Sequence, residues 1–381
     1  MRMPSYFLAW KYLCARRGQT AIMLAGMTLA LYLPLATHWL VDRFDRDIRA
    51  RAEATPLVIG AKGSRFDLVL HSLYFRSRVD GTVPYGEVRA LRDAKLGKVY
   101  PLHGKFTARD QRVIGIAPDY LNFRGMPLAQ GRSLQYLGDC VLGATAAEQL
   151  KLQPGGKLRT DRDNLFDLAG EYPVQLNVVG VLAPVGTADD EAVFVNLKTA
   201  WVIAGIWHGH EGDSNQTHDT SQKFVKKYLE FTEANRGSFH FHGKPEKFPL
   251  TAIVLAPTDA KAMALALNHY QADEKLQALK PPMVVGELMS TVTRVVQMLD
   301  ANFMLMAVGT GLLMALIVLL SRRLRTREME TLFLLGCDRQ TQLAMQAAEL
   351  AILFAAAASL ASLAAWFTAV WAGDRLLTLA A

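Results

Sequence analysis

The sequence has little cysteine and lacks the short motifs that mark nucleotide hydrolysis or covalent catalysis. Its three cysteines are Cys14, Cys140 and Cys337, and no two of them form a Cys-x-x-Cys pair. Neither a disulfide framework nor a cysteine-based metal site is therefore expected. The sequence also has no Gly-x-x-x-x-Gly-Lys-Ser/Thr phosphate loop, no Gly-x-Ser-x-Gly elbow and no His-Glu-x-x-His. These absences exclude a P-loop ATPase and leave no candidate catalytic centre, so we expect a protein that is not an enzyme.

The composition lies between that of a soluble protein and that of a protein wholly embedded in a membrane. Of the 381 residues, 51% are apolar and 20% are charged, which fits a few membrane spans joined to a large polar domain. The net charge of +7 would suit a nucleic-acid partner, but the basic residues cluster beside apolar runs, at Lys11, Arg16 and Arg17 and again over 322–327. Such clusters are typical of the cytoplasmic ends of spans. We therefore expect no nucleic-acid partner.

Three apolar runs are long enough to cross a hydrocarbon layer of about 30 Å. We predict transmembrane helices at 20–41, 295–320 and 343–373. The first run is longer than the apolar part of a signal peptide and no small-residue cleavage site follows it, so we expect it to be retained. The flanking positive charge places the N-terminus and the loop 321–342 in the cytoplasm.

This orientation places residues 42–294 and the short tail 374–381 outside, in the periplasm of a protein of the bacterial inner membrane. Residues 1–19 combine aromatic side chains such as Trp10 with basic ones. That pattern predicts a cytoplasmic amphipathic helix that lies at the interface between lipid and water.

The region 42–294 mixes predicted strands with predicted helices. Short runs rich in β-branched and apolar residues predict strands at 57–59, 67–70, 99–100, 112–116, 140–142, 174–182, 192–195 and 251–255. Helical patterns start at 84, 144 and 258. The predicted fold class is therefore a membrane α-helical protein of three transmembrane helices, with a large α+β extracytoplasmic domain inserted after the first.

Five of the nine histidines fall within the segment 208–242, namely His208, His210, His218, His240 and His242. Imidazole and nearby carboxylates suit Zn²⁺, so one interpretation is an external loop that captures or senses zinc. The other interpretation is a polar, solvated loop whose histidines are incidental, because their spacing matches no closed four-ligand site.

Three parts of the sequence resemble one family in their order along the chain. The external region contains Gly60-Ala-Lys-Gly-Ser, Gly115-Ile-Ala-Pro-Asp-Tyr, Leu128-Ala-Gln-Gly-Arg, Val141-Leu-Gly-Ala-Thr-Ala-Ala-Glu-Gln-Leu, Pro154-Gly-Gly-Lys and Val178-Val-Gly-Val-Leu. The opening Leu8-Ala-Trp-Lys-Tyr-Leu and the loop Arg327-Glu-Met-Glu-Thr-Leu-Phe-Leu-Leu-Gly complete the pattern. Together they resemble the permeases of ABC transporters of the macrolide-exporter, lipoprotein-release and cell-division FtsX type. That family has three spans after its external domain, whereas two are found here.

The resemblance implies a permease subunit that couples ATP hydrolysis by a separate cytoplasmic ATPase dimer to movement of its periplasmic domain. A second permease copy or a related permease, membrane lipid and a periplasmic partner protein are the other implied partners. The exported or extracted substrate would be a lipoprotein, a peptide or an amphipathic molecule. The residues implied to couple to the ATPase are Arg327, Glu328, Glu330, Leu332, Leu335 and Gly336.

Two alternative functions remain at this stage. One is a metal-linked ABC transport component, which the histidine loop alone favours. The other is a membrane regulator or scaffold of the FtsX type that transports nothing. No cofactor is expected to bind directly to the chain, apart from zinc if the histidine loop binds it.

Overall fold

The computed structural model describes residues 5–161, 173–209, 229–233, 237, 239–241, 243–324, 334 and 339–379. The chain divides into two compact units. We call them the helical unit, Met1–Ile48 with Leu288–Ala381, and the α/β unit, Arg49–Glu287. Each is described by itself.

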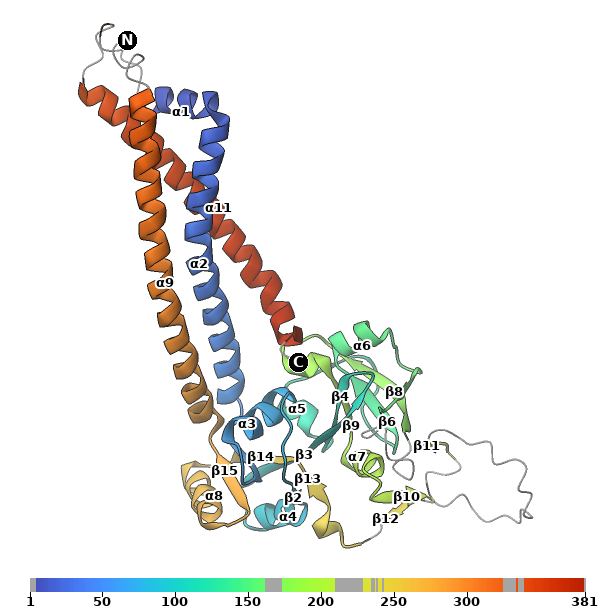
Figure 1. The fold of residues 1–381 in the computed structure, drawn as a ribbon. Coiled ribbons are helices and arrows are strands. Elements are labelled where there is room, and N and C mark those ends of the chain that lie inside the picture. The colour runs from blue at the N-terminus through green and yellow to red at the C-terminus, as the bar shows by residue number, and fades with distance from the viewer. Residues whose placement is uncertain are drawn as a thin grey trace. The chain divides into compact units, whose positions relative to one another are not determined.

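Among the described residues, the helices of the helical unit are α1 Ser5–Ala15, α2 Arg17–Glu53, α9 Pro281–Leu324 and α11 Arg339–Leu379 (Figure 1). Three of them contain a stretch that is long and apolar enough to cross a membrane, within Arg17–Glu53, Pro281–Leu320 and Leu343–Trp371. The prediction of three apolar membrane helices is confirmed in this sense. Both α2 and α9 extend beyond their apolar stretch into the sequence of the α/β unit.

One face of α11 is lined with alanine. Ala357, Ala361, Ala365 and Ala369 recur every fourth residue and are buried, and this spacing puts them on one side of a helix. Side chains of this size allow two helices to approach closely inside a membrane. The guanidinium of Arg43 on α2 donates to the backbone oxygen of Ala369 at 3.1 Å, so α2 is one of the neighbours of this face.

A mixed sheet forms the centre of the α/β unit. Nine of its eleven described strands follow the order β11-β8-β6-β9-β4-β3-β14-β1-β15, and the other two, β5 and β7, pair with β8. The β4–β9, β6–β8 and β11–β8 pairs are parallel, and the remaining pairs are antiparallel. The strands are β1 Leu57–Ala61, β3 Gly97–Ala108, β4 Gln111–Ile116, β5 Leu128–Gly131, β6 Asp139–Leu142, β7 Lys157–Arg159, β8 Val174–Leu182, β9 Ala192–Asn196, β11 Leu229–Glu230, β14 Ala252–Pro257 and β15 Leu276–Leu279.

Helices and two small sheets complete the α/β unit. The helices are α3 Arg65–Tyr74, α4 Gly86–Asp93, α5 Tyr120–Phe123, α6 Ala144–Leu150, α7 Leu197–Ile203 and α8 Ala260–Ala272, with short 3₁₀ turns at Ala188–Glu191 (η1) and Pro245–Lys247 (η3). The small sheets pair β2 Val83–Pro84 with β13 Pro249–Leu250 and β10 Trp207–Gly209 with β12 Phe239–Phe241. The predicted mixture of strands and helices is confirmed.

One predicted strand is wrong, because residues 67–70 belong to helix α3. The hydroxyl of Ser64 caps this helix by accepting from the backbone N–H of Asp67 at 3.2 Å. The buried positions of α3 recur at helical spacing, since Leu68 and Ser72 are four residues apart and so are Val69 and Leu73. A short apolar run does not by itself distinguish a strand from a buried helix.

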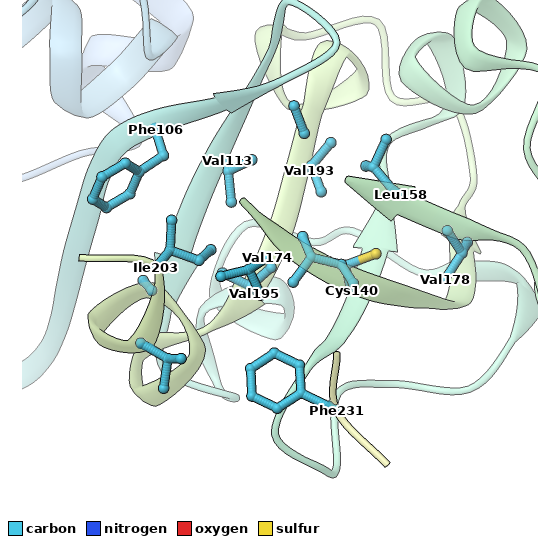
Figure 2. Close-up of a cluster of buried hydrophobic side chains, with 14 of the residues drawn as sticks. Phe106, Val113, Cys140, Leu158, Val174, Val178, Val193, Val195, Ile203 and Phe231 are labelled. Carbon is cyan, nitrogen blue, oxygen red and sulfur yellow. The ribbon is translucent and has the colours of Figure 1, made fainter. Parts of the chain in front are cut away.

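Two buried apolar clusters lie against the sheet. One contains Cys140 with Val178, Val195 and Phe231 from neighbouring elements (Figure 2). The other is built around residues such as Trp201. Burial raises the pKa of the Cys140 thiol, so this cysteine stays protonated and acts as a small apolar side chain.

Candidate functional site: the end of helix α2

The last turns of α2 are fixed in the α/β unit by a buried ion pair. Arg51 is 8% exposed and Asp189 is 2% exposed, and their charged atoms form two parallel hydrogen bonds. Nη1 donates to Oδ2 at 2.6 Å and Nη2 donates to Oδ1 at 2.8 Å. The remaining Nε–H of Arg51 donates to the backbone oxygen of Leu73, at the end of α3. This two-pronged geometry fixes the orientation of the guanidinium as well as its position.

The carboxylate of Asp189 is positioned by the short turn η1. Thr187 precedes this turn, and its hydroxyl donates to Oδ2 of Asp189 at 3.0 Å. The neighbouring Asp190 accepts from the backbone N–H groups of Val185 at 3.1 Å and Gly186 at 2.7 Å. The loop that carries Asp189 is thus closed by its own hydrogen bonds, and its carboxylate is already oriented to receive Arg51.

A second set of contacts holds the residues that follow α2. The hydroxyl of Thr55 donates to the backbone oxygen of Arg51 at 3.0 Å and accepts from the guanidinium of Arg124 at 2.8 Å. Arg124 also stacks against the rings of Tyr120 and Phe123, at 5.5 and 5.1 Å. The exit from α2 therefore contacts both η1 and α5.

Burial and pairing act on Arg51 in opposite directions. Burial alone lowers the pKa of the guanidinium, but the nearby Asp189 more than compensates, so the pKa of Arg51 lies above its usual value. Arg51 therefore carries its charge at every physiological pH. Removing one partner of such a pair leaves a buried charge uncompensated, at a cost of about 3–5 kcal/mol.

The first turns of α9 enter the α/β unit with different chemistry. Val284 and Val285 are 5% and 2% exposed, so this end is held by apolar packing. The ion pair between Glu287 and Arg65 at this end, at 3.2 Å, is about half exposed on both sides, and exposed pairs contribute little to stability. The charged, buried attachment belongs to α2.

The predicted site residues are mostly outside the part of the chain that the structure describes. All six predicted coupling residues, Arg327 to Gly336, lie there, as do His210, His218 and His242. The backbones of His208 and His240 are described and lie opposite each other in the β10–β12 pair. Among the described residues, no group of three potential metal ligands occurs. The zinc site stays a prediction.

Sequence reasoning did not find Arg51 and Asp189. Arg43, Arg46 and Arg49 precede Arg51 in the same helix, and nothing in the spacing marks the one that is buried. The only usable signal is the run Thr187-Ala-Asp-Asp-Glu, in which a threonine followed by acidic residues is typical of a capped turn.

Three long apolar helices together with a separate α/β unit are typical of a membrane protein that carries an extracytoplasmic domain. The sequence model of the MacB-like periplasmic core domain matches residues 20–229, more than half of the chain. The chain belongs to this family.

Three solved structures show how far the likeness extends. The periplasmic region of MacB from Actinobacillus actinomycetemcomitans is 12% identical, with 63% of this chain and 97% of that chain covered and a TM-score of 0.38. The extracellular domain of the noncanonic ABC-type transporter YknZ from Gram-positive bacteria is 12% identical, over 58% and 98% of the two chains, with a TM-score of 0.34. A domain of a putative permease from Porphyromonas gingivalis is 11% identical, over 59% and 86%, with a TM-score of 0.28. No curated protein sequence matches the chain significantly. The family assignment is based on the sequence match and not on these structures.

Proposed function

We propose that this chain is the permease subunit of an ABC transporter and that it passes movement of its membrane helices to the α/β unit through the Arg51–Asp189 pair. The observation that carries the proposal is the buried, bidentate attachment of the end of α2. An ATPase in another chain supplies the energy, because the sequence has no phosphate loop.

The length of α2 supports this function. The helix has 37 residues, which at 1.5 Å per residue corresponds to about 55 Å. A hydrocarbon layer of about 30 Å leaves roughly 25 Å of the same helix outside it. A continuous helix of this kind transmits a displacement along its axis, provided that its far end is firmly attached. The Arg51 pair is that attachment.

The remaining parts of the proposal follow the family. A cytoplasmic ATPase dimer contacts the segment that holds Arg327, Glu328, Glu330, Leu332, Leu335 and Gly336, and two permease chains sit on it. The α/β unit lies in the periplasm and the chain in the inner membrane. The work done there moves a lipoprotein, a peptide or an amphipathic molecule, with or without a periplasmic partner protein.

The test compares ATP hydrolysis with the response of the α/β unit. The full chain is reconstituted with its ATPase, and hydrogen exchange of residues 185–191 is measured with and without ATP. In the native protein, ATP is expected to change this exchange. Arg51→Met combined with Asp189→Leu keeps the site packed without charge, and it should keep ATP hydrolysis while losing the ATP-dependent change.

A matched control separates attachment from general loss of charge. Arg46 is exposed on the same helix and donates to the backbone oxygen of Asp42 at 3.2 Å, so Arg46→Met should leave both readouts unchanged. An ATP-dependent response that survives in the double variant would show that movement reaches the α/β unit by another route. Absence of any ATPase in complex with the native chain would refute the permease function itself.

A further inference from the structure

A histidine on α2 and an aspartate on α9 meet inside the apolar runs that are predicted to span the membrane. Nε2 of His38 lies 2.9 Å from Oδ1 of Asp300. Because a carboxylate oxygen accepts hydrogen bonds, the imidazole N–H is the donor. At about 1.5 Å per residue, His38 lies about 5 Å inside the end of the predicted span 20–41, and Asp300 lies about 8 Å inside the start of the span 295–320. Two separate apolar runs thus give the two side chains a similar depth.

The setting makes each of these two side chains dependent on the other. His38 is 48% exposed and Asp300 is 41% exposed. Inside an apolar run this exposed surface faces hydrocarbon or another helix, where an ionisable group is costly unless it is paired. The hydrogen bond between the two side chains lowers that cost for both. Ionisable pairs of this kind are rare in membrane helices, and the default interpretation is that they have a function.

Asp300 belongs to the face of α9 that its neighbours cover. Over 296–317, the buried or half-buried positions of α9 recur at intervals of three, four or seven residues, at Val296, Asp300, Phe303, Thr310, Met314 and Ile317. With this spacing, two helices pack along a continuous seam. Helix α2 is the partner at two points, since a Cβ added to Gly26 would lie 3.7 Å from Cε of Met314 and His38 contacts Asp300. The two helices therefore run antiparallel and side by side (Figure 1).

The residues one helical turn to either side on α2 disfavour any other register. A packed helix changes register by steps of one turn, about 5.4 Å. Such a step would bring Asp300 opposite Asp42, another carboxylate, or in the other direction opposite Pro34, whose side chain donates no hydrogen bond. Arg43, the next cation along α2, is turned toward α11, where it donates to the backbone oxygen of Ala369 at 3.1 Å. The observed contact therefore defines one register of α2 against α9.

We propose that the contact between His38 and Asp300 locks α2 to α9 and passes displacement of α9 to α2. This inference rests on the proposed function. The predicted coupling segment 321–342 follows α9, whereas the buried attachment to the α/β unit, Arg51 with Asp189, belongs to α2. Movement that starts at the ATPase therefore reaches α9 first and needs a firm link to α2. A polar contact in an apolar seam supplies such a link, because fixing the register is the best-attested role of polar groups between helices.

The first experiment measures the register of the two helices by cross-linking the full chain in membrane vesicles. In a chain that has no other accessible cysteine, Gly26→Cys is combined with one of three changes on α9, Thr310→Cys, Met314→Cys or Val318→Cys. A short bifunctional thiol reagent then joins each pair. Gly26 and Met314 face each other in the structure, whereas Thr310 and Val318 lie about one turn to either side. The chain with the native His38 and Asp300 should therefore give its highest yield with Met314→Cys.

Two variants test the lock itself. In the leucine variant, His38→Leu with Asp300→Leu, both polar groups are gone, so the cross-linking yield should spread over all three cysteine pairs. The exchanged variant, His38→Asp with Asp300→His, restores a donor and an acceptor and should bring back the preference for Met314→Cys. Leucine suits an apolar run, so the leucine variant should insert and fold. Recovery in the exchanged variant separates the contact from a general effect of either substitution.

The second experiment measures transmission. The full chain is reconstituted with its ATPase, and hydrogen exchange of residues 185–191 is compared with and without ATP. The leucine variant keeps the coupling segment and the pair of Arg51 and Asp189, so it should hydrolyse ATP as the native chain does but lose most of the ATP-dependent change in exchange. The exchanged variant should regain that change. The matched control, Gln297→Leu with Asn302→Leu, removes two exposed polar side chains of α9 and should leave both readouts native.

The outcomes separate this proposal from the proposed function. A leucine variant that keeps the Met314→Cys preference, or that keeps the ATP-dependent exchange in full, would overturn the lock. If that variant fails to fold, Asp300→Leu alone replaces it, and a folded Asp300→Leu chain with the native cross-linking pattern overturns the lock as well. A native chain without any ATP-dependent change in exchange would refute the proposed function and the transmission with it. The cross-linking yields would then still decide whether His38 and Asp300 fix the register of α2 against α9.

Discussion

Acid should destabilise the α/β unit through His103, which is buried in strand β3. This side chain is 2% exposed, and neither ring nitrogen has a hydrogen-bond partner. Burial, with a smaller effect of the nearby His71 and Lys105, lowers the pKa of His103 from 6.5 to about 4. The pKa of His71 is also lowered by its burial. Both imidazoles are therefore neutral in the folded protein at pH 7.

The sign of the effect follows from which state binds the proton first. As the pH falls below 6.5 the unfolded chain protonates His103 while the folded chain does not, so the free energy of unfolding decreases. The loss begins near pH 6.5 and ends near pH 4, where the folded protein also binds the proton. This lowering of the pKa of His103 decreases the free energy of unfolding by about 3.4 kcal/mol once the loss is complete, and by about 2 kcal/mol at pH 5.

The assay is urea unfolding of the full chain in detergent at pH 7.5 and at pH 5, followed by circular dichroism of the α/β unit. Between these two pH values, the free energy of unfolding of His103→Leu should decrease by about 2 kcal/mol less than that of the native chain. His269, which is exposed on α8, supplies the control, because His269→Leu should leave the pH dependence unchanged. Equal losses for the native chain and His103→Leu would refute the reasoning.

Three other predictions concern the attachment of α2 and the coupling segment. Arg51→Ala or Asp189→Ala should each lower the free energy of unfolding by about 3–5 kcal/mol, measured by urea unfolding, because each leaves a buried charge alone. Gly143→Ala should cost about 1–3 kcal/mol, since its added Cβ would lie 2.3 Å from the backbone oxygen of Asp189. Gly336→Pro with Leu332→Asp should abolish co-purification of the ATPase, because these changes end the predicted coupling helix and charge its apolar face.

Each of these predictions has a control and a contradicting result. At Gly63, an added Cβ would have no atom within 4 Å, so Gly63→Ala should leave the free energy of unfolding unchanged. An equal decrease in the free energy of unfolding for Gly143→Ala and Gly63→Ala would contradict the steric argument. Arg46→Ala is the control for Arg51→Ala, and the ion-pair argument fails if both substitutions lower the free energy of unfolding by the same amount. Unchanged ATPase binding by the Gly336 and Leu332 double variant would contradict the coupling role.

The membrane helices could be predicted from sequence because their signal is strong and local. An apolar run of the required length needs no knowledge of its neighbours, and the three helices were found on this basis. Most strands of the sheet were also found, whereas α3 was misread because its capping Ser64 precedes an apolar run that is short enough to be a strand. Short pairs such as β2 with β13 have too few residues to give any pattern.

The attachment site could not be predicted because its partners are distant in sequence. Arg51 and Asp189 are separated by 138 positions. No local pattern marks Arg51, and the run that begins at Thr187 predicts a capped turn but not the distant residue with which Asp189 pairs.

The end of α2 is held by an ion pair and the start of α9 by apolar packing, and this difference decides which of the two helices is fixed against rotation about its axis. An α-helix turns by about 100° per residue, so a slip of one residue would carry Arg51 away from Asp189 and leave both charges buried without a partner. The pair therefore fixes the rotation of α2 about its axis as well as its position along it. Apolar contacts such as those of Val284 and Val285 on α9 are less directional, because a valine that moves slightly still packs against hydrocarbon. If one of the two helices transmits torque to the α/β unit, the geometry favours α2, and a substitution that keeps the charge but loses the two-pronged contact, Arg51→Lys, should weaken transmission more than it weakens folding.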